Sequence, residues 1–126
     1  MTKKMNILLC EDELIISLDL KRILKKLGYN VSGIYKSAED VLDSLHNEKP
    51  DLVIADVNLK GKMNGIELAE ILISKHAIKV MFITGSPLMN QDKKSKVAEC
   101  DFIMKPFDEA TLKEKLHNCF HPLQSI

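Results

Sequence analysis

Short apolar runs alternate with amphipathic segments along this chain, and that alternation constrains the fold more than any other feature. The runs contain few polar residues, as do strands buried on both faces of a parallel sheet. Between them, apolar residues recur at the three- and four-residue spacing of a helix with one buried face. Strands are therefore expected at residues 5–10, 30–35, 51–55, 79–83 and 101–104.

Residues with capping preferences mark where the intervening helices begin and end. Gly28 follows the last apolar position of the first helix, where glycine commonly stops a helix. The segment near 88–99 has the weakest apolar periodicity, so we expect it to be the most mobile helix. The remaining helices are expected to follow Ser37, Asn64-Gly65 and Asp108.

Strands that alternate with helices predict an α/β fold with a parallel sheet and helices on both of its faces. The 126 residues fit one domain, 1–126, and we expect no output domain after the last helix. In such a fold, ligands bind beyond the carboxyl ends of the strands, where the strand order reverses. Function is therefore expected at those strand ends.

The charge balance argues against several classes of partner. Lys and Arg number 18 and Asp and Glu number 18, so no sequence-wide field attracts nucleic acid or an acidic membrane. The apolar run at 5–10 is too short for a signal sequence or a membrane span. We therefore expect a cytoplasmic protein without direct DNA binding. The three cysteines and four histidines lack the spacing of a disulfide framework or a zinc site, and the cysteines are expected to be small buried hydrophobes.

Polar residues gather where four of the five expected strands end. Each residue alone could cap a helix or close a turn. Packing does not explain their joint placement, which predicts a site at one edge of the sheet. The residues are Glu11, Asp12 and Glu13 after the first strand, Asp56 and Asn58 after the third, Thr84 after the fourth and Lys105 after the fifth.

The chemistry of this set favours phosphoryl transfer assisted by a metal ion. Crowded carboxylate oxygens suit a hard cation such as Mg²⁺. Asp56 can attack phosphorus without a general base, because a carboxylate is already ionised at neutral pH. Thr84 and Lys105, with backbone N–H groups after the third and fourth strands, would offset charge on the transferring phosphoryl oxygens.

A resemblance to a known family rests on the stretches ILLCEDE, PDLVIADVNLKGKMNGIELA, VMFITGS and FIMKPF. The chain resembles the receiver domain of two-component response regulators over nearly its whole length. The resemblance implies a (βα)5, doubly wound, five-stranded parallel sheet of flavodoxin-like order 2-1-3-4-5. It also implies a cis peptide bond between Lys105 and Pro106.

The resemblance implies a role for each site residue. Asp56 would accept a phosphoryl group from a sensor histidine kinase or a histidine phosphotransfer protein. Asp12, Asp56 and the backbone carbonyl of Asn58 would hold Mg²⁺ or Mn²⁺, with Glu11 assisting through water. Thr84 and Lys105 would bind the phosphoryl oxygens.

A switch that alters the binding of an unidentified downstream protein is implied as well. On phosphorylation, the Thr84 hydroxyl would move inward and the Phe102 ring would turn in to fill the gap. The output face would comprise the helix near 88–99, the strand at 101–104 and the last helix. A second copy of the chain is another candidate partner there. The lysines of that face, which would favour an acidic partner, are Lys93, Lys94 and Lys96.

Other functions are compatible with parts of this pattern. A flavodoxin-like FMN carrier would need a phosphate-binding loop where the acidic residues at 11–13 stand. A phosphatase of the haloacid dehalogenase type would need a second acid where Asn58 stands, two residues after Asp56. The third alternative is an interaction domain on the same scaffold that works without phosphorylation. Only the intact pocket argues against it. Many relatives have two aspartates where Glu11-Asp12 stands, so metal affinity is expected to differ.

Overall fold

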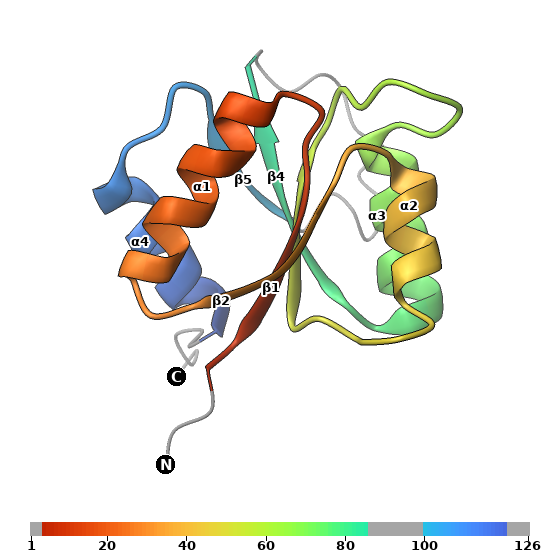
Figure 1. Ribbon diagram of the computed structural model, residues 1–126, viewed down its shortest axis with the longest axis horizontal. Coiled ribbons are helices and arrows are strands. Elements are labelled where there is room, and N and C mark those ends of the chain that lie inside the picture. Colours follow the sequence, from red (N-terminus) through yellow and green to blue (C-terminus); the bar gives the residue numbers. More distant parts are fainter. Residues whose placement is uncertain (1–3, 86–99, 121–126) are drawn as a thin grey trace, which may run out of the picture.

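A computed structural model of the chain describes residues 4–85 and 100–120. Its centre is a five-stranded sheet in which all neighbouring strands are parallel, in the order β2-β1-β3-β4-β5 (Figure 1). The predicted fold class and strand order are thereby confirmed. The strands are β1 (Asn6–Cys10), β2 (Asn30–Tyr35), β3 (Leu52–Asp56), β4 (Lys79–Thr84) and β5 (Asp101–Met104).

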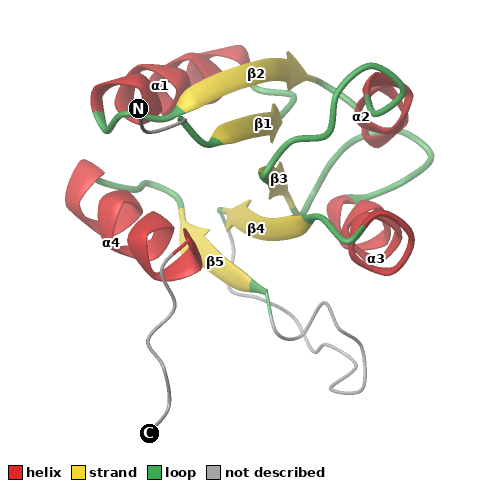
Figure 2. Ribbon diagram, turned by 90° about the horizontal axis from the view of Figure 1, so that it is seen from below, coloured by secondary structure: helices red, strands yellow, loops and turns green. Residues whose placement is uncertain are grey.

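Helices cover both faces of the sheet. Figure 2 shows α1 and α4 on one face and α2 and α3 on the other. The predicted helix near 88–99, with Lys93, Lys94 and Lys96, lies outside the described residues. The described helices are α1 (Leu14–Lys26), α2 (Ala38–Ser44), α3 (Gly65–His76) and α4 (Glu109–Phe120).

The sheet separates two apolar cores, and the central strand β3 contributes to both. Ile54 packs into the core that also contains residues of α1 and α4. Its neighbours Val53 and Ala55 pack into the core that contains residues of α2 and α3. Successive side chains of a strand point to opposite faces, so burial on both faces makes β3 a continuous apolar run.

Local hydrogen bonds stop and start the helices near the predicted positions. The Tyr29 N–H donates to the Leu24 carbonyl at 2.9 Å, across Gly28 with φ of 97°. Glycine adopts this left-handed conformation without strain, which explains why α1 ends there. At the start of α2, the Ser37 hydroxyl accepts the Asp40 N–H at 3.2 Å.

The helices that follow the site loops have their own caps. Asn64 and Glu67 form a reciprocal capping box at the start of α3, with N–H to side-chain distances of 2.9 and 3.0 Å. Asp108 accepts the Thr111 N–H at 2.7 Å before α4, and this bond lowers the pKa of Asp108. These caps fix the direction in which the chain leaves the site.

Two strands extend one residue further than the apolar runs predict. The sheet ladder pairs Asp56 with Ile83 and Thr84 with Met104, so both polar residues end strands and do not begin loops. Strand geometry therefore fixes their backbones.

The cysteines are buried to different degrees. Cys10 is fully buried, and burial raises its pKa to about 12. Cys100 and Cys119 are half-buried against the two cores, so the prediction for them is confirmed in part. None of the three forms a disulfide. Within the described residues, no helix has the length and apolar character needed to span a membrane.

Candidate functional site

Strand register brings the predicted polar residues to the carboxyl edge of the sheet. Cys10 pairs with Ala55, so the residues that follow them, Glu11 just after β1 and Asp56 at the end of β3, emerge side by side. The Lys105 N–H donates to the Thr84 carbonyl at 2.7 Å, which continues the pairing of β4 with β5. Four chain segments far apart in sequence therefore supply one site.

Asp56 lies at the centre of this site and is held at both carboxylate oxygens. The residue is 4% exposed. Its Oδ1 accepts the Asn58 N–H at 2.9 Å, and its Oδ2 lies 3.1 Å from Lys105 Nζ. The Val57 N–H, in turn, donates to the Ile83 carbonyl at 3.2 Å, which anchors the backbone just beyond the carboxylate. A buried carboxylate needs such partners, because burial without them is costly.

The acidic groups of the site surround the side-chain ammonium of Lys105. Its Nζ lies 2.9 Å from Glu11 Oε1, 3.1 Å from Asp56 Oδ2 and 3.6 Å from Glu13 Oε1. Burial alone would lower the pKa of Lys105, but its contacts with Glu11 and Asp56 outweigh burial and raise it. The peptide bond from Lys105 to Pro106 is cis, as predicted.

Glu11 is a buried acid with an unusual pKa. It is 1% exposed, and burial raises its pKa to about 7 despite the opposing pull of Lys105. Its N–H donates to the Tyr35 carbonyl at 2.9 Å, and its Oε2 accepts the Glu13 N–H at 3.1 Å. No described residue gives Glu11 Oε1 a hydrogen bond of good geometry, although Lys105 is close.

The acidic groups are close enough together to hold a metal ion. Glu11, Asp12, Glu13 and Asp56 each place one carboxylate oxygen within 4.8 Å of the others. The oxygen ligands and the surplus of negative charge over the Lys105 ammonium suit a hard divalent cation. The residues present therefore fit Mg²⁺ or Mn²⁺.

Glu13 belongs to this cluster, although the predicted metal ligands did not include it. Three consecutive acids at the end of β1 were the signal in the sequence. In an extended chain, successive side chains point to opposite sides, so the Asp12 side chain would point away from those of Glu11 and Glu13. The chain bends at Asp12 before α1 begins, and all three carboxylates lie close together.

Gly65 is a second residue whose importance the sequence did not reveal. A Cβ on Gly65 would overlap the Asp56 carbonyl oxygen, so no larger residue fits without movement of the backbone. The Gly65 N–H also donates to the Val57 carbonyl at 3.1 Å. The loop that carries Asn58 is thus folded tightly against the end of β3.

The predicted switch residues differ in burial. Thr84 is fully buried at the end of β4. Phe102 is half-buried on the edge strand β5 and packs against the core on the α2 and α3 side. Lys115 of α4 lies over it, with Nζ 5.7 Å from the ring centroid, and also pairs with Asp101 at 2.9 Å. Phe102 is therefore partly fixed by a cation from another element.

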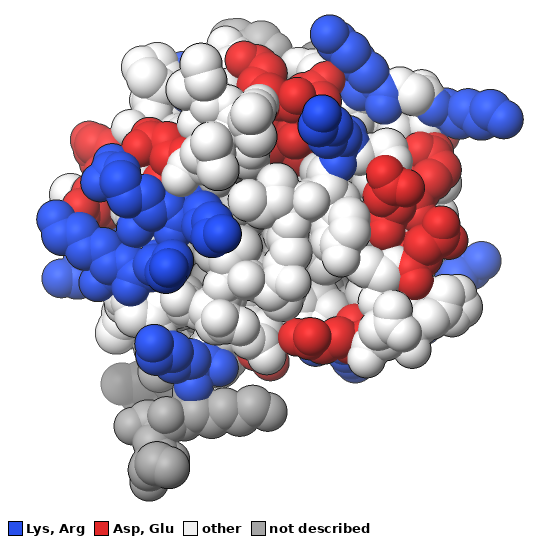
Figure 3. Space-filling model, viewed as in Figure 1, with Lys and Arg blue, Asp and Glu red and all other residues white. Residues whose placement is uncertain are grey.

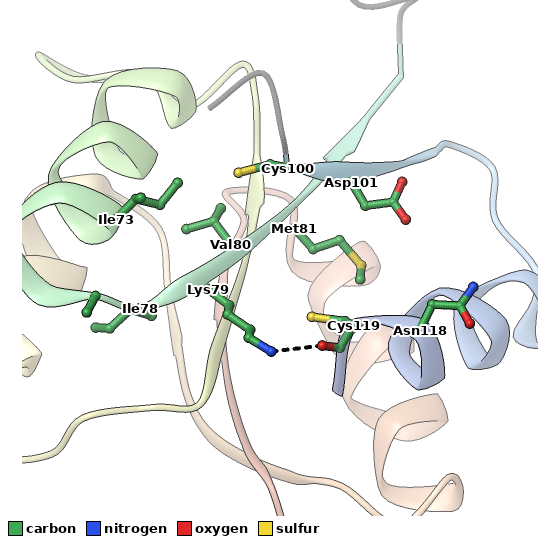
Figure 4. Close-up of a pocket in the computed structure, with 10 residues that line it drawn as sticks. Ile73, Ile78, Lys79, Val80, Met81, Cys100, Asp101, Asn118 and Cys119 are labelled. Carbon is green, nitrogen blue, oxygen red and sulfur yellow. Dashed lines mark hydrogen bonds between the residues drawn. The ribbon is translucent and has the colours of Figure 1, made fainter. Parts of the chain in front are cut away.

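A separate cavity of about 460 Å³ lies at the opposite end of the sheet. It is bounded by the amino ends of β4 and β5 and by the end of α4 (Figure 4). Cys100 and Cys119 contribute to its wall, and Lys79 donates to the Cys119 carbonyl at 2.9 Å (Figure 4). None of the acidic residues of the site lines it.

Comparison with known proteins identifies one family and relatives that match this chain over all or part of their own length. The family model described as response regulator receiver domain matches residues 7–117. Chemotaxis protein CheY-3 of Vibrio cholerae is 33% identical over 130 aligned positions, covering 98% of this chain and 97% of that protein. The phyllosphere-induced regulator PhyR of Methylorubrum extorquens is 33% identical over 82 residues, which cover 64% of this chain and 31% of PhyR.

Other relatives are longer than this chain or have solved structures. The transcriptional regulatory protein PdtaR of Mycobacterium tuberculosis is 28% identical over 107 residues, and the match spans 52% of its length. The receiver domain of Erythrobacter litoralis PhyR superposes with a TM-score of 0.83 at 28% identity, covering 98% of this chain and 95% of that one. A receiver domain of a modulated diguanylate cyclase from Desulfovibrio desulfuricans gives 0.81 at 26% identity, covering 94% and 95%.

Proposed function

The chain belongs to the response regulator receiver family of two-component signalling, and from that membership we propose that it is a switch whose phosphoryl acceptor is the Asp56 carboxylate. A receiver domain is a signalling module rather than a classical enzyme. The reaction assigned to it is its own phosphorylation and dephosphorylation. Its output is a change in partner binding.

One observation carries this proposal: the Asp56 carboxylate is buried between Lys105 Nζ and the Asn58 N–H, beside three further acids. A carboxylate with a purely structural role would need a cation partner and no acidic neighbours. The surrounding acids repel the Asp56 carboxylate, which raises the electrostatic free energy of the site. That cost is consistent with a site built to accept a cation and a phosphoryl group.

The reaction uses groups that the chain itself supplies. One Asp56 oxygen attacks phosphorus, so that an O–P bond forms while the N–P bond of a phosphohistidine donor breaks. The electron pair of that bond stays on the donor imidazole, which takes up a proton from water. Lys105 Nζ, the Thr84 hydroxyl and backbone N–H groups, including that of Asn58, offset charge on the phosphoryl oxygens.

Asp12, Asp56 and the Asn58 backbone carbonyl would hold Mg²⁺ or Mn²⁺, with Glu11 acting through water. When bound, the cation supplies charge neutralisation for the transferring phosphoryl group. Phosphorylation would draw the Thr84 hydroxyl inward and turn Phe102 toward the core. The output face would include β5 and α4, where a downstream protein or a second copy of the chain binds.

The donor would be a sensor histidine kinase or a histidine phosphotransfer protein. Next to the site, the first turns of α1 expose three large apolar side chains, those of Leu14, Ile15 and Leu18. Further along α1, Lys and Arg residues gather on the outer surface, while acidic residues gather over α2 (Figure 3). The zero net charge therefore conceals local patches that can orient a protein donor, and we assign no role in DNA binding.

Intact mass spectrometry after incubation with acetyl phosphate tests the proposal. We expect a gain of about 80 Da that requires Mg²⁺, is abolished by a chelator and is absent from Asp56→Asn. An unmodified chain, with no spectral response to beryllofluoride either, would instead favour a phosphorylation-independent interaction domain.

A further inference from the structure

Glu13 occupies the N-cap position of α1 without acting as a cap. Its side chain makes no hydrogen bond to the first turn of the helix, and that turn contains no acidic residue. Glutamate is not among the residues that favour this position. Its carboxylate instead lies toward the site, with Oε1 3.6 Å from Lys105 Nζ. Helix capping therefore does not explain this side chain.

We propose that Glu13 is a fourth carboxylate of the cation site, which strengthens divalent cation binding and takes up the Lys105 ammonium when Asp56 is engaged. This inference rests on the proposed function, because it concerns the same site. It adds a residue to the three acids already assigned there. Glu13 is a positioning residue in this role.

The geometry places Glu13 within reach of the same cation as the other three acids. Its carboxylate oxygen lies within 4.8 Å of those of Glu11, Asp12 and Asp56. A second observation concerns the buried Glu11 Oε1, which receives no hydrogen bond of good geometry from a described residue and whose ion-pair partner, Lys105 Nζ at 2.9 Å, is shared with Asp56 and Glu13. The ammonium of Lys105 is shared among three carboxylates and cannot neutralise all of them.

Differences in burial separate the roles of the acids. The Glu13 side chain is 63% exposed, whereas those of Glu11 and Asp56 are 1% and 6% exposed. Mg²⁺ keeps several of its waters when bound to proteins, so an exposed carboxylate at the rim suits contact through water. The 3.6 Å distance to Lys105 is also the longest of the three ion pairs, which makes Glu13 the easiest partner to rearrange.

Titration with Mn²⁺, followed by the loss of the free-ion electron paramagnetic resonance signal, tests this role without any phosphoryl donor. We expect Glu13→Gln to raise the Mn²⁺ dissociation constant about three- to tenfold, since a charge near a dication in a water-like dielectric contributes on that scale. Glu13→Asp should recover part of the affinity. Glu70→Gln, an equal charge change on the exposed surface of α3, should leave it unchanged.

Thermal unfolding separates a role in cation binding from a structural one. In chelator, Glu13→Gln should unfold within a degree or two of the native chain, and it should gain less stability than the native chain when Mg²⁺ is added. Equal Mn²⁺ affinities of Glu13→Gln and the native chain, while the native chain binds Mn²⁺ and is phosphorylated, would overturn this inference alone. A native chain that neither binds Mn²⁺ nor gains a phosphoryl group would overturn the proposed function as well.

Discussion

Lys105 Nζ lies 3.1 Å from Asp56 Oδ2, so the end of one strand and the loop after another are joined by an ion pair at the centre of the site. Both side chains are largely buried, at 14% and 6% exposed. The same ammonium pairs with Glu11 at 2.9 Å. The ion pair therefore has two consequences, one for stability and one for phosphoryl transfer.

Removing the Lys105 ammonium should destabilise the metal-free protein. Lys105→Met leaves two buried carboxylates without their cation, and we expect the free energy of unfolding to fall by about 1–3 kcal/mol. Mg²⁺ should restore part of that loss. Urea denaturation with chelator and with Mg²⁺ measures both effects, and Lys75→Met on the exposed surface of α3 is the control. An unchanged stability in chelator would contradict the assigned role of the ion pair.

The raised pKa of Glu11 predicts a pH dependence of stability. The folded state binds a proton at Glu11 below a pKa of about 7, whereas the unfolded chain does so only below 4.5. The Glu11 contribution is therefore most favourable at low pH, declines as pH rises from 4.5 to about 7 and is constant above that. Urea denaturation of the native chain and of Glu11→Gln across this pH range isolates the Glu11 contribution to stability. A difference between the two proteins that does not vary with pH would contradict the prediction.

Gly65 should be needed for phosphorylation because it lets the loop after β3 fold against the Asp56 carbonyl. Gly65→Ala places a Cβ where the backbone already lies, so we expect a loss of about 2 kcal/mol or more and slower phosphorylation. Gly28→Ala is the matched control. It should cost about 1 kcal/mol through its positive φ and leave the phosphorylation rate unchanged. Equal phosphorylation rates in the two variants would argue against this role of Gly65.

Lys115 should restrain the Phe102 ring on the edge strand. Lys115→Gln removes both the cation over the ring and the ion pair with Asp101, so we expect the ring resonances of Phe102 to shift before any phosphorylation. The change in stability should remain below about 1 kcal/mol, because the pair is partly exposed. Lys113→Gln, on an exposed position of the same helix, should leave the ring resonances in place. Identical Phe102 ring resonances in the two variants would show that Lys115 does not restrain the ring.

Much of the fold and of the site could be predicted because their signals are local. Gly28, Ser37 and the Asn64-Gly65 pair mark helix ends through hydrogen bonds to residues a few positions away. The polar residues at strand ends follow from parallel pairing, which brings those ends to one edge. Parallel pairing therefore predicts that Asp56 and Lys105 lie near each other.

The features that escaped prediction depend on loop conformation and on side-chain direction. Membership of Glu13 in the acidic cluster depends on the bend of the chain at Asp12, just before α1. The contact of Gly65 with the Asp56 carbonyl requires the full path of the intervening loop. The position of Lys115 over Phe102 joins two elements whose packing no sequence period specifies.

The position of the phosphoryl acceptor tests the central claim most directly. The native chain is incubated with Mg²⁺ and acetyl phosphate, reduced with borohydride, digested and mapped by peptide mass spectrometry. Reduction of an aspartyl phosphate gives homoserine, and we predict homoserine at position 56 in a reaction that requires Mg²⁺. An unaltered aspartate at position 56, with homoserine elsewhere or nowhere, would contradict the account.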